Sequence, residues 1–124
     1  MRSLILAAVA LSVPALAAPN GIEKRLATRV VGAPQNCVQR SLLRYSDVID
    51  HKAIVYTASN GTRLYVNEPT AGLRDLDDGN ILVMRSPSGL VCSNDTIDLV
   101  DRYTQLARGF VRLGKFVPYD KPRS

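Results

Sequence analysis

The sequence has few of the residues from which catalytic sites are usually built: one histidine, two cysteines and no tryptophan among 124 residues. The histidine, His51, has no separate acidic residue that the sequence identifies as its orienting partner, which argues against a Cys–His catalytic pair. The G-x-S-x-G spacing of a serine nucleophile elbow is absent around Ser86 and Ser88. These absences favour a protein without recognisable catalytic chemistry, and we expect no cofactor.

Long runs of basic residues are also missing. The formal net charge is +5, but the arginines and lysines are scattered singly, and no glycine-aromatic RNA-binding pattern occurs. We therefore expect a solvated surface with a modest positive excess and no nucleic-acid partner. Binding to nucleic acid or to another anionic surface or polymer stays open as an alternative, and it requires that the scattered arginines gather on one face.

The one long apolar run lies at the N-terminus, over residues 4–16, and follows the basic Arg2. It is shorter than the roughly 20 residues needed to span a bilayer, and Ala15-Leu16-Ala17 fits the A-x-A cleavage rule. We expect residues 1–17 to form a signal-peptide helix that is cut off before Ala18; a membrane anchor or a buried helix is the alternative. The mature chain is then periplasmic or secreted, with no membrane anchor.

Both cysteines, Cys37 and Cys92, belong to the expected mature chain. An even number of cysteines in an exported protein predicts a disulfide, because the compartment is oxidising. Two free buried thiols are the alternative. A bond between Cys37 and Cys92 closes a loop of about 55 residues. Closing such a loop stabilises a fold by about 4 kcal/mol in the chain-entropy treatment.

Residues 53–68 carry the strongest secondary-structure signal. Two β-rich runs flank Asn60-Gly61, which predicts a hairpin with a type I′ turn. Tyr56 and Tyr65 are then candidates for a cross-strand pair. We favour core packing for the two rings over a stacking surface for a sugar or nucleotide.

The segments on either side of this hairpin are assigned from their periodicity and their proline and glycine content. Residues 18–36 predict a flexible spacer, with a short helix as the competing prediction. A small β domain over residues 37–119 and a charged tail over 120–124 follow. Within the domain, we assign 38–49 to a first strand with an interruption, and a helical turn near Ser41 is the competing prediction. Residues 81–86 are assigned to a central strand and 90–92 to an extended segment. Residues 96–108 fit either a strand followed by a loop or a helix, and 110–117 are assigned to the closing strand.

These assignments predict a mainly β fold: a small antiparallel sheet or partly open barrel of five to six short strands. Turn signals recur about every 8 to 12 residues, as is typical of such folds.

Five motifs between residues 37 and 118 together resemble an uncharacterised family of small exported proteins of Gram-negative bacteria, a domain of unknown function. The resemblance implies a location and a style of fold, but no activity. It also implies two further cysteines, near Ala71 and before Leu113, where this chain has none. The motifs are Cys37-Val38-Gln39-Arg40, Asp50-His51-Lys52, Arg63-Leu64-Tyr65-Val66-Asn67, Leu90-Val91-Cys92-Ser93-Asn94-Asp95-Thr96-Ile97 and Leu113-Gly114-Lys115-Phe116-Val117-Pro118.

Two segments are candidates for a site. His51 beside Asp50 fits a general base or a pH-responsive group, although its setting favours a turn residue at a strand junction. The loop 75–80, which begins with Asp75 and ends with Asn80, carries clustered carboxylates. Because their order departs from that of an EF-hand, we expect a solvated acidic loop and no metal site.

The sequence thus favours a non-enzymatic exported β-domain that binds a partner or envelope component, with an unknown envelope or secreted protein as the partner. The alternative is a small periplasmic enzyme or enzyme inhibitor that uses a site near His51 and the 75–80 loop. Oligomeric state is not predicted.

Overall fold

A computed structural model describes residues 21–85 and 88–122. The expected signal peptide lies outside this range, as do Ala18, Pro19 and Asn20. The elements are α1 (Gly21–Ala27), β1 (Val30–Val31), β2 (Cys37–Gln39), the 3-10 turn η1 (Arg40–Leu42), β3 (Leu43–Ile49), β4 (Ala53–Ala58), β5 (Arg63–Asn67), the 3-10 turn η2 (Leu73–Asp75), β6 (Asn80–Met84), β7 (Leu90–Cys92), β8 (Thr96–Asp101), β9 (Ala107–Arg112) and β10 (Phe116–Asp120).

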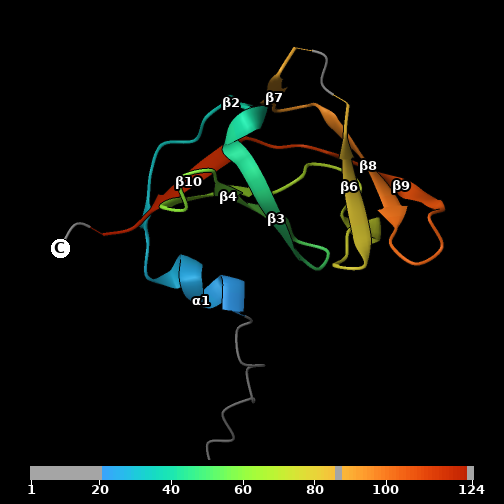
Figure 1. Ribbon diagram of the computed structural model, residues 1–124, viewed down its shortest axis with the longest axis horizontal. Coiled ribbons are helices and arrows are strands. Elements are labelled where there is room, and N and C mark those ends of the chain that lie inside the picture. Colours follow the sequence, from blue (N-terminus) through green and yellow to red (C-terminus); the bar gives the residue numbers. More distant parts are fainter. Residues whose placement is uncertain (1–20, 86–87, 123–124) are drawn as a thin grey trace, which may run out of the picture.

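The fold is mainly antiparallel β, as the sequence predicts. The described strands form three sheets, ordered β1-β10-β5-β4-β3, β2-β7 and β6-β8-β9, so they do not close into one barrel. In Figure 1 the three-stranded sheet lies on the right, while α1 and the C-terminal end of the described chain lie on the left. The described residues form more strands than the five or six predicted, in part because β1, β2 and β7 are only two or three residues long.

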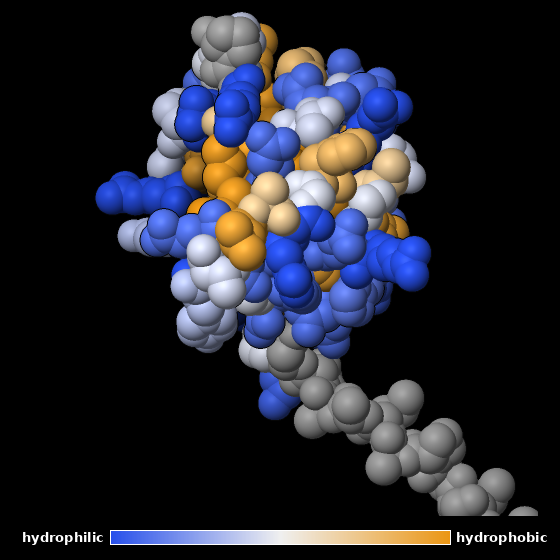
Figure 2. All heavy atoms as spheres, turned by 90° about the vertical axis from the view of Figure 1, so that its right-hand side faces the viewer, coloured by the Kyte–Doolittle hydropathy of each residue, from blue (hydrophilic) through white to orange (hydrophobic). Residues whose placement is uncertain are grey.

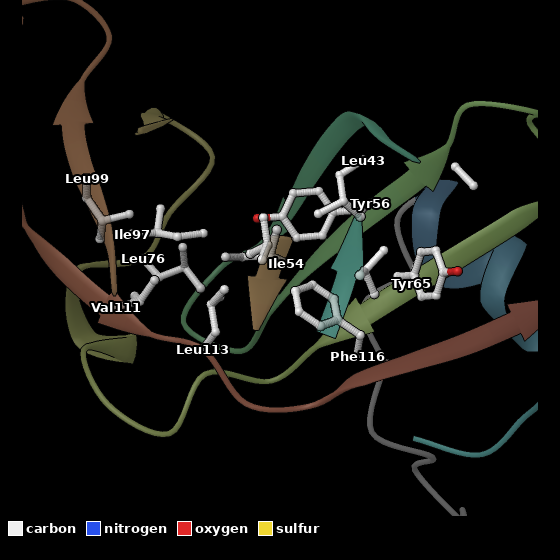
Figure 3. Close-up of a cluster of buried hydrophobic side chains, with 13 residues drawn as sticks. Leu43, Ile54, Tyr56, Tyr65, Leu76, Ile97, Leu99, Val111, Leu113 and Phe116 are labelled. Atoms are coloured by element: carbon white, nitrogen blue, oxygen red, sulfur yellow. The ribbon is translucent and has the colours of Figure 1, made fainter. Parts of the chain in front are cut away.

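The main core lies between the five-stranded and three-stranded sheets. Strand β4 alternates between two apolar environments: Ile54 and Tyr56 face the main core, whereas Ala53 and Val55 face a second cluster that contains Ile22 of α1. Figure 3 shows the main cluster, to which every sheet contributes side chains. Burial of both faces of β4 explains why residues 53–58 are almost continuously apolar.

The central hairpin is confirmed, with Tyr56 directly opposite Tyr65 and both rings buried. The predicted type I′ turn is wrong, because only Gly61 has a positive φ (74°). The N–H of Gly61 donates to the carbonyl of Ala58, and the side chain of Asn60 accepts from the N–H of Thr62. The hairpin loop is therefore longer than the two residues of a type I′ turn. Asn60 stabilises this loop through its side-chain hydrogen bond and does not adopt the positive φ that a type I′ turn requires.

The segment predicted as a flexible spacer contains regular structure. Helix α1 buries Ile22 against the five-stranded sheet, and β1 pairs with the end of β10 through Val30↔Asp120. The competing prediction of a short helix is therefore the better one for residues 21–27. The predicted tail also begins too early, because Asp120 belongs to β10 and binds Arg63.

Three further assignments can be compared with the structure. Residues 37–49 contain both a strand and a helical turn, because η1 separates β2 from β3. Residues 96–108 form the strand-then-loop alternative, and β9 begins at Ala107. Strand β6 is an edge strand of the three-stranded sheet and not the predicted central strand.

A buried amide links two motifs that are distant in the sequence. The side chain of Asn67 donates to the carbonyl of Gly114 and accepts from its N–H, both at 2.8 Å. A Cβ on Gly114 would collide with the backbone oxygen of Glu68, so only glycine fits here. This contact fixes the entry of the chain into β10.

Candidate functional site

The predicted disulfide is present. Cys37 and Cys92 are bonded to each other and are direct partners in the antiparallel β2–β7 pair, with a Cα–Cα distance of 4.0 Å. The described residues include no free cysteine. The bond fits a protein that matures outside the reducing cytosol, and its role is to hold the small sheet together.

The structure brings His51 next to the start of the acidic loop. The ring nitrogen Nδ1 lies 3.2 Å from the carbonyl oxygen of Leu73, and the backbone N–H of His51 donates to Leu76. The residue has a positive φ of 59° in an exposed turn between β3 and β4. Its described partners are backbone carbonyls and not the acid and hydroxyl that a catalytic arrangement requires.

The acidic loop uses its polar groups to hold its own shape. Asp77 accepts from the N–H of Gly79, Asn80 donates to the carbonyl of Asp75, and the N–H of Asp78 donates to Asp50. Within residues 21–85 and 88–122, no group of three or more His, Cys, Asp or Glu side chains is placed to hold a metal ion. The loop thus behaves as a structural connection.

The feature best suited to binding is the outward surface of the three-stranded sheet. Register places Ile81 beside Val100, and Val83 in a row with Asp98 and Phe110. The alternate residues of these strands, Leu82, Ile97, Leu99 and Val111, pack into the core. We call this outward surface, together with the loop that joins β8 to β9, the apolar face. Its residues are Ile81, Val83, Val100 and Phe110 of the sheet and Tyr103 and Leu106 of the loop.

Four of these side chains are unusually exposed for apolar residues. Tyr103 is 86% exposed, Leu106 66%, Phe110 52% and Ile81 42%. Figure 2 views the molecule from this side and shows hydrophobic side chains in a stripe that is bordered by hydrophilic ones. A group of adjacent exposed apolar side chains, unlike single scattered ones, typically marks an interaction surface.

The loop that carries Tyr103 and Leu106 is held by Asp101. One carboxylate oxygen accepts from the N–H groups of Tyr103 and Thr104, at 2.8 and 2.9 Å. The backbone of Asp101 also bonds Gln105 and Leu106. The hydrogen bonds from Thr104 and Tyr103 lower the pKa of Asp101 below its ordinary value. The loop therefore presents its apolar side chains from an ordered backbone.

Arginines surround the apolar face. Arg85 pairs with Asp98 at 2.9 Å, and Arg108 lies 3.8 Å from Asp101. Arg112, which is exposed, stands opposite Thr96. Asp98 lies between Val83 and Phe110 on the central strand β8, so its ion pair with Arg85 belongs to the face itself.

Sequence reasoning missed this site. Both Phe110 and Val111 are apolar, so alternation along β9 does not reveal which one faces outward. Residues 81–84 form a continuous apolar run, which is typical of a strand buried on both faces. The available signal was the pair Tyr103 and Leu106 in a segment predicted to be a loop, where apolar residues have no core to enter.

No protein-family model, no curated protein and no solved structure matches this chain. The resemblance to an exported family therefore remains an expectation. Among the described residues, no helix has the length and apolar character needed to cross a membrane.

Proposed function

We propose that the protein is a non-enzymatic β-domain that is exported to the periplasm or secreted and binds a protein partner through the apolar face. The observation that carries this proposal is the exposure of Phe110 and Ile81 on the outward side of the three-stranded sheet, together with that of Tyr103 and Leu106 on the loop that joins β8 to β9. Leaving such side chains in water forfeits about 1.5 to 3 kcal/mol for each large one. A partner that covers them recovers this free energy.

The chemistry of the face indicates the chemistry of the partner. An apolar centre with aromatic residues and an arginine rim is the usual composition of a protein–protein interface. Arg85 and Arg108 are already paired with Asp98 and Asp101, so Arg112 is the arginine that favours a partner with an acidic group at the edge of its apolar contact surface. We therefore favour an envelope or secreted protein over a small-molecule substrate.

The export step rests on two features. The N-terminal sequence has the pattern of a cleaved signal, and the disulfide between Cys37 and Cys92 suits an oxidising compartment. The enzyme or inhibitor alternative has less support, because the described partners of His51 are the backbone carbonyls of Leu73 and Leu76 and not a second acid or a hydroxyl.

Site-specific photo-crosslinking in the native envelope tests the proposal. A crosslinker placed at Phe110 or Leu106 is expected to capture one defined protein, and the same crosslinker at Tyr45, which is exposed on a different sheet, is not. With the purified partner, Leu106→Ser and Phe110→Ser should each weaken binding by at least about tenfold. Tyr45→Ser is the matched control. Capture from Tyr45 alone, or full affinity in both face variants, would show that the proposal is wrong.

A further inference from the structure

We infer that a pocket at the opposite end of the molecule binds a phosphate group, carried by a small soluble molecule or by a lipid headgroup. The pocket has a volume of about 480 Å³ and is lined by Arg25, Thr28, Arg29, Gly61, Lys121 and Pro122. This site goes beyond the proposed function, because it shares no residue with the apolar face. We call it the basic pocket.

Three segments that are distant in the sequence meet there: the end of α1, the tip of the β4–β5 hairpin and the chain that follows β10. In Figure 1, α1 and the end of β10 lie on the left, away from β6, β8 and β9 on the right. Gly61 lines the pocket without a side chain, and a Cβ there would meet nothing within 4 Å. The hairpin tip therefore leaves the pocket open to a ligand.

Among the residues that the structure describes, the lining carries three positive charges and no carboxylate. Asp120, which lies close enough to influence Arg29, is already held by Arg63 through two hydrogen bonds of 2.7 and 2.9 Å. Because Asp120 is engaged by Arg63, it offsets the charge of Arg29 only in part, and its own effect is to raise the pKa of Arg29. Arg29 responds to this environment, since burial and the nearby charge of Arg25 both lower its pKa.

Arg29 is also positioned for a ligand. Its Nη1 donates to the carbonyl oxygens of Thr62 and Tyr119, at 2.6 and 3.2 Å. These are its described hydrogen bonds, so Nε and Nη2 keep their hydrogens for another acceptor. A guanidinium held in this way suits the bidentate recognition of a tetrahedral oxyanion, and a second arginine and a lysine add charge.

The class of ligand follows from the charge. A carboxylate brings one negative charge, whereas a phosphate group brings up to two and presents several acceptor oxygens. Three cations in one pocket are matched better by the phosphate. Free phosphate compounds and anionic lipid headgroups share this chemistry, so the test must separate them.

Titration of the mature domain with inorganic pyrophosphate, followed by calorimetry at moderate ionic strength, tests the inference. Wild type should bind, and Arg25→Gln and Lys121→Gln should each lose about tenfold in affinity. Neither side chain makes a described hydrogen bond, so both variants should fold normally, which thermal unfolding checks. Lys52→Gln removes the same charge from the far hairpin turn and is the matched control.

Vesicles of phosphatidylcholine, with and without phosphatidylglycerol, separate the two sources. Binding to pyrophosphate alone indicates a soluble ligand, and additional binding that depends on phosphatidylglycerol indicates a headgroup. Absence of binding to both probes, or equal losses in Lys52→Gln and the two pocket variants, would overturn the inference. Leu106→Ser should leave phosphate binding intact, so failure of this inference and failure of partner binding are distinguishable.

Discussion

Tyr56 is the one buried side chain whose polar atom has no hydrogen-bond partner among the described residues. The ring packs near Phe116, with ring centroids 6.1 Å apart, in the cluster that Figure 3 shows. Burial raises the pKa of the Tyr56 hydroxyl well above its ordinary value, so the group stays neutral. The ring contributes apolar contact, while the hydroxyl has lost its water without gaining a partner.

Tyr56→Phe should therefore leave the free energy of unfolding unchanged or raise it by about 1 kcal/mol, because it removes an unsatisfied group and keeps the ring. Urea unfolding measures this. Tyr65→Phe is the control, since the Tyr65 hydroxyl accepts from Arg63 at 3.4 Å. A loss of more than about 1 kcal/mol in Tyr56→Phe would mean that the hydroxyl has a partner.

Asn67 presents the opposite case, because its buried amide is fully engaged with Gly114. Asn67→Ala should lower the free energy of unfolding by about 2 to 4 kcal/mol, since it leaves the N–H and carbonyl of Gly114 buried and unpaired. Thermal and urea unfolding are suitable measurements. Gln39→Ala, which shortens an exposed amide, should have little effect; equal effects in the two variants would argue against the buried contact.

At the scale of elements, alternation and turn residues predict the central hairpin, but they do not predict how strand edges are used. The predicted closing strand over 110–117 is wrong, because residues 110–112 end β9 and residues 116–117 begin β10, in two different sheets. The chain leaves one sheet for the other at Gly114, which the buried amide of Asn67 holds.

The prediction that β6 lies at the centre of a sheet is wrong. A continuous apolar run occurs in central strands, but it also occurs in edge strands that other parts of the chain cover. Helix α1 is only seven residues long, too short to be stable alone, and it forms because Ile22 and Leu26 pack on the sheet. Such tertiary support leaves little trace in local sequence.

The loop after β5 and the end of β9 lie side by side. Ala71 and Arg112 form an antiparallel bridge, and the N–H of Arg112 donates to the carbonyl of Ala71 at 3.1 Å. These are the two neighbourhoods in which the family resemblance implies a further cysteine pair. Bridge partners have Cα atoms about 4.5 to 5.5 Å apart, which is within the range of a disulfide.

The double substitution Ala71→Cys with Arg112→Cys should form a second disulfide and raise the free energy of unfolding by roughly 2 to 4 kcal/mol. Mass spectrometry checks the bond, and thermal unfolding under oxidising conditions checks its effect. Ala71→Ser with Arg112→Ser is the matched control. A double variant that keeps two free thiols would contradict the placement of the two segments.

The loop that carries Tyr103 and Leu106 should depend on pH. Because hydrogen bonding lowers the pKa of Asp101, its ionised form stabilises the loop above the unfolded pKa of about 3.9, and this stabilisation is lost as the pH falls through the lower folded value. Amide NMR shifts of Tyr103 and Thr104 in an acid titration report the change. Asp101→Asn should abolish the transition; a midpoint at or above about 3.9 would contradict the hydrogen-bonded geometry.

For the whole molecule, composition and periodicity predict a small β domain with a disulfide, and the structure has both. The two surfaces that we propose for binding could not be predicted in the same way. The apolar face depends on which side of β9 looks outward, and the basic pocket joins Arg25 to Lys121 across nearly the full length of the chain. Both arise from the register of sheets, which separate stretches of sequence do not encode alone.

The pairing of β1 with β10 has a practical consequence for anyone who handles the protein. It brings Val30 beside Asp120, so the chain that follows β10 lies where Arg25, Arg29 and Lys121 meet. Gly21, in contrast, lines a different pocket together with Asn80 and Leu82 of β6. An affinity tag or fluorescent fusion at the C-terminus would therefore crowd the basic pocket, and material without such a tag is the right reagent for anion titrations.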